Sequence, residues 1–323
     1  MIISSHSFRR LASRVPATIQ AGRAQYLTSP QPAPASIPKP SPAHIFSDQA
    51  SSALEPAAST GMLPFDLSSK LGTAYPATTA NLLARYLVVR EGEEHEFLPQ
   101  ATSVLCYVIK GSGRTFREDE VIEWTSGDAF LFPGGESLLF EAPDGNAVVF
   151  IVTDEPLLAS IGCVAPPGDD AKVQSAHYTA KTIAAQIEDM RAAETPPPET
   201  ILKFGSAPFA QKGCVAPAMA AGVATLEPGA EQGEHCHDAD TILLCLECEG
   251  VYSLVDGARA DWVPNAALLM PAGAAHSQHN PGEKRMLSFY VQDRGPRDVR
   301  TWEPGTQHAR ANAHNDAAAP AAG

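Results

Sequence analysis

Two stretches in the second half of the chain decide the fold: residues 229–237 read GAEQGEHCH, and residues 271–280 read PAGAAHSQHN. His235 and His237 are two positions apart, so on a β-strand their side chains point to the same face. His276 follows a Pro-x-Gly turn and begins a later strand. Three imidazoles that converge inside a small β-barrel hold one metal ion from one side and leave other coordination positions open, which suits Fe(II) or a similar divalent ion. The two stretches therefore predict a mononuclear three-histidine metal site.

The spacing of these residues resembles the two sequence motifs of the cupin superfamily. The motifs have the forms Gly-x5-His-x-His and Pro-x-Gly-x2-His-x3-Asn, and they are filled here by Gly229, His235, His237, Pro271, Gly273, His276 and Asn280. Many cupins have a metal-binding glutamate four residues after the second histidine, and this chain has Thr241 there. Three histidines without a carboxylate resemble the ring-cleaving dioxygenase branch, above all the gentisate 1,2-dioxygenase-like bicupins.

The resemblance implies an all-β fold of two tandem cupin barrels, each a jelly roll or double-stranded β-helix, joined by a helical linker. From Leu82 onward, short apolar runs alternate with Gly and Pro turns, which is typical of all-β sandwiches and barrels. The chain also contains an internal repeat. Trp124 precedes Pro133 by nine residues, and Trp262 precedes Pro271 by the same interval.

Counting along this repeat predicts that the first barrel has no metal ligands. The count places Gly92 on Gly229, Leu98 on His235, Gln100 on His237, Val104 on Thr241 and Leu138 on His276. None of the first-barrel residues in these positions is a metal-binding type. His95 is out of register, and we expect it to have a surface role.

The expected organisation follows from these anchors and from composition. It comprises a transit peptide and disordered linker over 1–47, an N-terminal arm over 48–80, a first barrel without ligands over 81–160, a helical linker over 161–200, a second barrel with the metal site over 201–295 and a disordered tail over 296–323. Within the linker, Ile183, Ile187 and Met190 have helical spacing and predict a helix over 179–194 that packs across the barrels.

The chain of 323 residues is acidic, with 37 Asp and Glu against 23 Lys and Arg. This balance argues against nucleic acid or an anionic membrane surface as a partner. No apolar run is long enough to span a bilayer. We expect the six scattered cysteines to be reduced. Cys245 and Cys248 form a single CxxC pair, for which a structural role and a zinc module are both open.

The first 47 residues contain no Asp or Glu, whereas they include Arg9, Arg10, Arg14 and Arg23 among Ser and Ala. This composition predicts a mitochondrial transit peptide. The alternative is a disordered tail without a targeting role, in which case we expect a cytoplasmic protein.

Strand alternation also indicates which side chains surround the metal. Gln278 shares the face of His276, and Thr241 shares the face of His235 and His237, so Gln278 and Thr241 are the candidate catalytic residues. Gln278 could instead be a rim residue that meets water. Arg259, Arg285, Tyr290 and Gln292 are further candidates for the pocket, with a solvated turn favoured for Arg285 and ordinary packing for Tyr290. Cys236 and His279 should point away.

We expect one divalent ion, Fe(II) by preference, although Mn, Ni, Cu or Zn suit the same nitrogen donors. The resemblance implies a dioxygenase that cleaves an aromatic or related hydroxy acid with O2, and bicupins of this kind suggest a homo-oligomer. Those enzymes generally carry their metal in the first barrel, whereas here the second barrel carries the histidines. A non-oxidative lyase, hydrolase or isomerase and a non-enzymatic small-ligand-binding bicupin are the alternatives.

Overall fold

The computed structural model describes residues 9–10, 18–24, 27–28, 41–166, 168–192, 197–207 and 209–294. The chain divides into two compact units, Met1–Lys39 and Pro40–Gly323. The first unit contains β1 (Arg9–Arg10), α1 (Ile19–Arg23) and β2 (Leu27–Thr28), of which β1 and β2 pair antiparallel. Most of the expected transit peptide and all of the expected tail over 296–323 lie outside the described residues. The targeting role stays a prediction.

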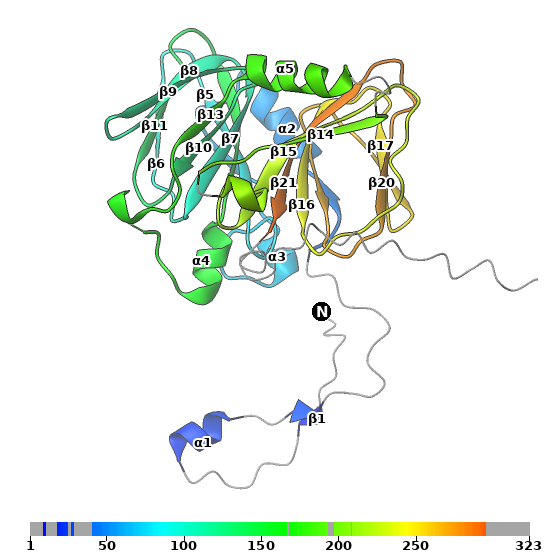
Figure 1. Cartoon of the computed structure of the whole chain (residues 1–323). Helices are drawn as coiled ribbons and strands as arrows, with labels where there is room; N and C mark the ends of the chain where they lie inside the picture. Colours follow the sequence, from blue (N-terminus) through cyan, green and yellow to red (C-terminus); the bar gives the residue numbers. More distant parts are fainter. Residues whose placement is uncertain are drawn as a thin grey trace, which may run out of the picture. The chain divides into compact units, whose positions relative to one another are not determined.

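The second unit contains two antiparallel β-barrels (Figure 1). The first barrel has a six-stranded sheet of order β13-β10-β7-β12-β5-β4 and a four-stranded sheet of order β6-β11-β8-β9. Its strands are β4 (Gly61–Pro64), β5 (Leu83–Val89), β6 (Glu94–Phe97), β7 (Ser103–Lys110), β8 (Ser112–Arg117), β9 (Glu120–Thr125), β10 (Ala129–Pro133), β11 (Leu138–Glu141), β12 (Ala147–Thr153) and β13 (Ala176–Tyr178).

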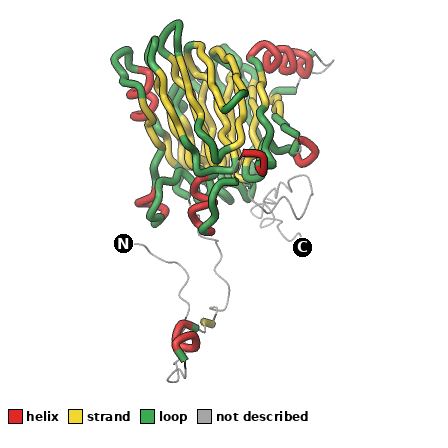
Figure 2. The backbone as a smooth tube through the Cα atoms, turned by 90° about the vertical axis from the view of Figure 1, so that its left-hand side faces the viewer, coloured by secondary structure: helices red, strands yellow, loops and turns green. Residues whose placement is uncertain are grey.

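The second barrel has a six-stranded sheet of order β14-β15-β21-β16-β19-β3 and a three-stranded sheet of order β18-β17-β20. Its strands are β3 (His44–Ile45), β14 (Glu199–Lys203), β15 (Met219–Leu226), β16 (Thr241–Glu247), β17 (Tyr252–Val255), β18 (Ala258–Asp261), β19 (Ala267–Met270), β20 (His276–His279) and β21 (Met286–Asp293). Figure 2 shows the long strands of the barrels side by side.

One edge strand of the second barrel, β3, comes from an N-terminal segment that the sequence analysis left out of the fold. Strand β3 pairs with β19, and the Ser41 hydroxyl donates to the Asp240 carboxylate over 2.8 Å. Phe46 is fully buried, and its ring stacks on that of Phe65 with centroids 4.6 Å apart. We expected the folded part to start at residue 48. The structure shows that it begins earlier, before β3.

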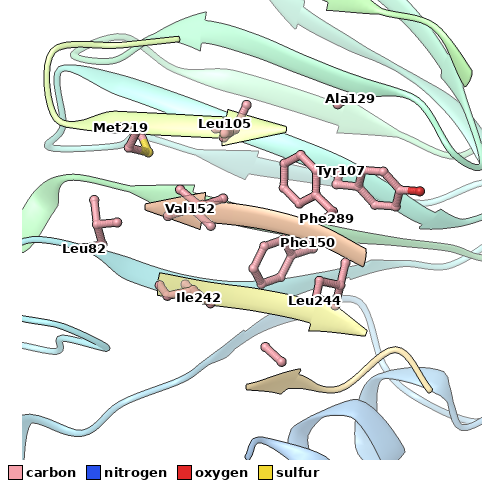
Figure 3. Packing of buried hydrophobic residues seen from close by; sticks show 14 of the residues in the cluster. Leu82, Leu105, Tyr107, Ala129, Phe150, Val152, Met219, Ile242, Leu244 and Phe289 are labelled. Atoms are coloured by element: carbon pink, nitrogen blue, oxygen red, sulfur yellow. The ribbon is translucent and has the colours of Figure 1, made fainter. Parts of the chain in front are cut away.

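The two six-stranded sheets pack against each other through one shared hydrophobic core (Figure 3). At its centre, Phe289 of β21 stacks on Tyr107 of β7 with ring centroids 4.8 Å apart, and Phe150 of β12 lies edge-on to Phe289 at 6.2 Å. Because side chains alternate along a strand, Tyr290 turns the other way, into the core of the second barrel.

Short helices fill the connections: α2 (Ser47–Leu54), α3 (Ser68–Leu71), α4 (Glu155–Ile161) and α5 (Ala180–Arg191), with the 3-10 turns η1 (Gly168–Asp170) and η2 (Ala210–Lys212). No helix in the described ranges is long and apolar enough to cross a membrane.

Helix α5 is the one that the sequence predicted over 179–194. It begins after Thr179, whose hydroxyl accepts the Thr182 N–H, and it buries Ile183 and Ile187 as expected. The prediction for Met190 was wrong, because this side chain is 41% exposed.

The helix connects the two barrels at its ends. The Ala180 N–H donates to Asp128 of the first barrel over 2.7 Å, and Arg191 pairs with Glu227 of the second over 2.6 Å.

The structure confirms the internal repeat. The Trp124 indole N–H donates to the Thr115 hydroxyl over 2.9 Å, and the Trp262 indole N–H donates to the Ser253 hydroxyl over 2.8 Å. Val104 pairs with Phe132 as Thr241 pairs with Met270, so Val104 and Thr241 are equivalent, as predicted.

The predicted equivalents of His235 and His237 were wrong by one residue. The Gly135 N–H donates to the Pro99 carbonyl, as the Gly273 N–H donates to the His237 carbonyl. Phe97 pairs with Leu138, as His235 pairs with His276. Leu98, placed on His235 by counting, is 56% exposed.

An extra residue in the second barrel causes this shift. Four positions separate Glu231 from His235, whereas their partners His279 and His276 are three apart. The first barrel has no such bulge between Glu94 and Phe97. The positions of the two ligand histidines are thus filled by Phe97 and Pro99. His95 lies half-buried on β6 opposite Phe140, which places it less at the surface than we expected.

Candidate metal centre

Two chain segments bring the three histidines together at one end of the second barrel. His276 is the first residue of β20, and its backbone forms a reciprocal pair with His235: the His235 N–H donates to His276 O over 2.9 Å, and the His276 N–H donates to His235 O over 2.8 Å. His237 follows two residues later in the segment that leads into β16. One ring nitrogen from each histidine lies within 4.8 Å of those of the other two.

The backbone fixes the tautomer of each ring. Nδ1 of His235, His237 and His276 lies 3.0, 2.7 and 2.9 Å from the carbonyl oxygens of Gly233, Ala239 and Ala274, respectively. A carbonyl oxygen only accepts hydrogen bonds, so each Nδ1 must carry the proton and donate it. In a neutral ring, Nε2 then presents its lone pair, as a metal ligand requires.

Burial keeps two of the rings uncharged. Desolvation lowers the pKa of His276 to about 4, with a further contribution from the two neighbouring imidazoles. Desolvation also lowers the pKa of His237. Neutral, oriented nitrogen donors at this separation fit a divalent transition-metal ion, and the three histidines are the only metal-binding cluster among the described residues.

Two polar side chains lie directly beside His237. The Thr241 hydroxyl is 3.3 Å from His237 Nε2, and the side-chain amide of Gln292 is 3.4 Å from the same atom. Thr241 pairs with Gln292 across β16 and β21, so both point into the barrel on the face that sequence alternation predicted. Thr241 brings a neutral hydroxyl to the position where many cupins have a carboxylate.

Gln278 lies within the barrel wall rather than at its rim. Its side chain is buried, and its amide nitrogen is 3.7 Å from the sulfur of Met270. The alternative of a rim residue that meets water was therefore wrong.

Arg294 is a cation near the site that the sequence did not single out. It follows β21 directly, and its Nε donates to Gln292 Oε1 over 3.3 Å. Its charge contributes to the lowered pKa of His237, after burial. Burial raises the pKa of Tyr290, and Arg294 opposes that shift. Arg294 is thus close to both side chains, although its place two residues beyond Gln292 gave no sign of this.

Glu199 of β14 is a second charged residue near the site. Its carboxylate accepts a hydrogen bond from Gln232, and burial raises its pKa while His235 works in the opposite direction. Glu199 pairs with Leu226, whose side chain belongs to the core of the second barrel, so the carboxylate lies on the inner face of β14.

Both arginines named from the sequence lie elsewhere. Arg259 stacks over the Tyr252 ring at 3.8 Å and pairs with Asp261, while Arg285 pairs with Glu188 of α5 over 2.7 Å. His279 points away from the site, as expected, and stacks on the other face of Tyr252 with centroids 4.6 Å apart.

Asn280, the last residue of the second motif, has a structural role. Its side-chain N–H groups donate to the carbonyls of Leu226 and Lys284 over 2.9 and 2.8 Å, and its side-chain oxygen Oδ1 accepts the Gly282 N–H over 3.2 Å. These bonds hold the turn between β20 and β21 against the end of β15.

The CxxC pair lies in the barrel core. Cys245 and Cys248 are buried among apolar side chains, and burial raises the pKa of both thiols, that of Cys248 to about 11. The pair is not part of the metal-binding cluster found among the described residues, which favours the structural role. Cys106 and Cys214 are also buried, Cys163 is exposed, and Cys236 is half-buried.

Comparisons with known proteins agree with this architecture. Residues 222–292 match the family model of the cupin domain. No curated protein matches the chain in sequence.

Among solved structures, the salicylate 1,2-dioxygenase from Pseudaminobacter salicylatoxidans is similar, with a TM-score of 0.67, 14% identity and coverage of 82% of this chain and 88% of that one. Its adduct with gentisate has a TM-score of 0.68, 10% identity and coverage of 86% and 88%. A single-residue variant of the same enzyme has a TM-score of 0.69 and 13% identity, with coverage of 86% of this chain and 91% of that one.

Because the sequence identities are only 10–14%, the similarity to these structures shows a shared fold and nothing more. The chain has an all-β fold of two tandem jelly-roll barrels, as the sequence predicted. The part of the second barrel that matches the cupin domain contains the three histidines.

Proposed function

We propose that this bicupin is a metal-dependent dioxygenase that acts on an aromatic or related hydroxy acid, with His235, His237 and His276 as metal ligands. One observation carries the proposal: three imidazoles with fixed tautomers converge at one point, and no carboxylate of the described residues joins this cluster. The hydroxyl of Thr241 in place of a carboxylate leaves the ligand set neutral.

Fe(II) fits these donors, and so do Mn, Ni, Cu and Zn. When bound, the ion would supply open coordination positions for the substrate and O2 and a path for electrons between them. The similarity to a salicylate dioxygenase that has been solved with gentisate supports both the oxidative chemistry and a hydroxybenzoate-like substrate.

The side chains around the histidines suit such a substrate. The guanidinium of Arg294 would bind its carboxylate, because the fork of N–H donors matches two carboxylate oxygens. Thr241 and Gln292 lie within 3.4 Å of His237 Nε2, so they would orient the polar groups of a substrate beside the ligands. Gln278 would contribute an amide from inside the barrel wall.

Oxygen uptake by the Fe(II)-loaded protein tests the proposal. We expect uptake that depends on an added hydroxybenzoate, with gentisate and salicylate as the first two compounds, and we expect none from the His276→Ala variant. Product formation without oxygen consumption would instead support a lyase, hydrolase or isomerase that uses the ion as a Lewis acid. Binding without any product would support a non-enzymatic bicupin.

A further inference from the structure

The first barrel contains a pocket of about 610 Å³. The pocket lies among β4, β5, β6 and α4, and Leu83, Arg85 and Phe97 are part of its wall. Ala84 and Tyr86 belong to the core shared by the two barrels, so the alternating Leu83 and Arg85 point to the inside of the first barrel. The pocket is therefore on the inner side of the sheet.

This position corresponds to the metal centre of the second barrel. Phe97 is the residue that pairs with Leu138 as His235 pairs with His276. A phenyl ring thus occupies the place of a ligand imidazole, and no metal-binding cluster is present among the described residues of this barrel. Most of the other lining side chains are also apolar, including those of Met62, Tyr75 and Leu158.

Three polar side chains, those of Arg85, Gln100 and Glu155, interrupt the apolar wall. The Arg85 side chain is only 7% exposed, and its guanidinium lies 4.9 Å from the centre of the Phe97 ring. Its Nη2 donates to the Glu155 carboxylate and, over 3.4 Å, to the Thr153 hydroxyl. Nε and Nη1 make no hydrogen bond to any residue that the structure describes, so most of the donors of Arg85 are open to a ligand.

The Glu155 carboxylate accepts three hydrogen bonds from this chain and offers no donor of its own. One of its oxygens accepts from Arg85 and from the Thr153 hydroxyl over 2.8 Å, and the other accepts the Gln100 N–H over 3.3 Å. The pocket therefore offers hydrogen-bond donors at one end and apolar, partly aromatic walls elsewhere.

We propose that the first barrel is a second, metal-free binding site for a flat apolar ligand that carries a carboxylate. The volume falls within the range of roughly 300–1,000 Å³ that is typical of small-molecule pockets. The aromatic side chains of Tyr75 and Phe97 are part of the wall, which suits an aromatic or similarly flat body. The open N–H groups of Arg85 select the acidic group. This site does not depend on the function proposed for the second barrel.

Naphthalene-2-carboxylate is a suitable probe, and its amide is the matched neutral compound. Ala159 is exposed on α4 and lines the pocket, so Ala159→Trp should fill the entrance without disturbing the core. Ser160→Trp is the control, because Ser160 is the next residue, equally exposed and outside the pocket lining. His276→Ala removes the metal centre of the other barrel.

We expect titration calorimetry to show binding of the acid that Ala159→Trp weakens by about tenfold or more. Ser160→Trp and His276→Ala should leave the dissociation constant within about twofold. The acid should bind about tenfold more tightly than the amide, because only the acid forms a charge-assisted bond to Arg85.

Cys163 gives an independent readout at the pocket. It is exposed and lines the pocket, whereas Cys106, Cys214, Cys245 and Cys248 are buried. Bound probe should slow its alkylation, measured by peptide mass spectrometry. Absence of binding, equal effects of the two tryptophan variants, or loss of binding in His276→Ala would overturn the site. Equal affinity for acid and amide would overturn the assignment of a carboxylate ligand.

Discussion

Replacement of His276 by alanine separates the metal-binding function of the second barrel from its folding. The ring of His276 is 2% exposed and donates one hydrogen bond to the Ala274 carbonyl. A neutral hydrogen bond contributes about 1 kcal/mol to stability, so we expect a modest loss for the metal-free protein from this bond, with a further loss from the vacated space.

The metal-dependent part of the stability should disappear completely. A ligand at a free concentration of 100 times its dissociation constant stabilises the folded state by about 2.7 kcal/mol. A change of 1 kcal/mol shifts the melting temperature of a domain of this size class by roughly 2–4 °C. We therefore expect Fe(II) to raise the melting temperature of the unmodified protein by about 5–10 °C and to have no effect on His276→Ala.

Anaerobic thermal unfolding with and without Fe(II) measures the shift in melting temperature, and elemental analysis of the purified protein measures its metal content. His279→Ala is the matched control, because His279 is on the same strand but stacks on Tyr252 outside the site. His279→Ala should keep the bound metal and the rise in melting temperature with Fe(II). The reasoning would be refuted if His276→Ala retained the bound metal and this rise, above all if a Cys245→Ser, Cys248→Ser double variant lost them.

Three further predictions address the surroundings of the site. In oxygen-uptake assays, Arg294→Gln should raise KM for a hydroxybenzoate by about tenfold or more at nearly unchanged kcat, because a charge-assisted bond to the substrate is lost. Arg285→Gln should change neither KM nor kcat, because Arg285 pairs with Glu188 on α5. Asn280→Ala should lower the free energy of unfolding in urea by about 2–3 kcal/mol, because the buried side chain holds the carbonyls of Leu226 and Lys284. Phe46→Ala should cost about 3–5 kcal/mol in the same assay, because the ring is fully buried, while Ile19→Ala, at a 74% exposed position of the other unit, should cost nothing measurable.

The histidines could be located from the sequence because their positions depend on local rules. His235 and His237 share a face through strand alternation, and the Pro-x-Gly turn announces the strand of His276. The repeated interval from tryptophan to proline likewise predicted the second copy of the barrel. Each of these signals lies within a few residues of the feature that it predicts.

Features that depend on distant pairings could not be predicted in the same way. Ser41 and Asp240 are 199 positions apart, and nothing near Ser41 indicates that β3 joins the second barrel. The bulge before His235 shifts the register by one residue, which counting from a fixed glycine cannot detect. Arg294 reaches the site only because β21 lies beside β15 and β16.

The arrangement of β21 explains why a barrel without metal ligands bears on the metal centre. Gln292 of this strand lies beside His237, whereas Phe289 and Val291 belong to the core shared by the two barrels. Since Phe289 stacks on Tyr107 of β7, the first barrel supports the strand that forms one wall of the site.

Strand β5 shows the same division on the other side of the shared core. Tyr86 packs in that core, and Arg85 faces the first-barrel pocket. The metal centre and the pocket therefore lie on opposite sides of one rigid double layer of sheets, and packing in this layer sets the geometry of both.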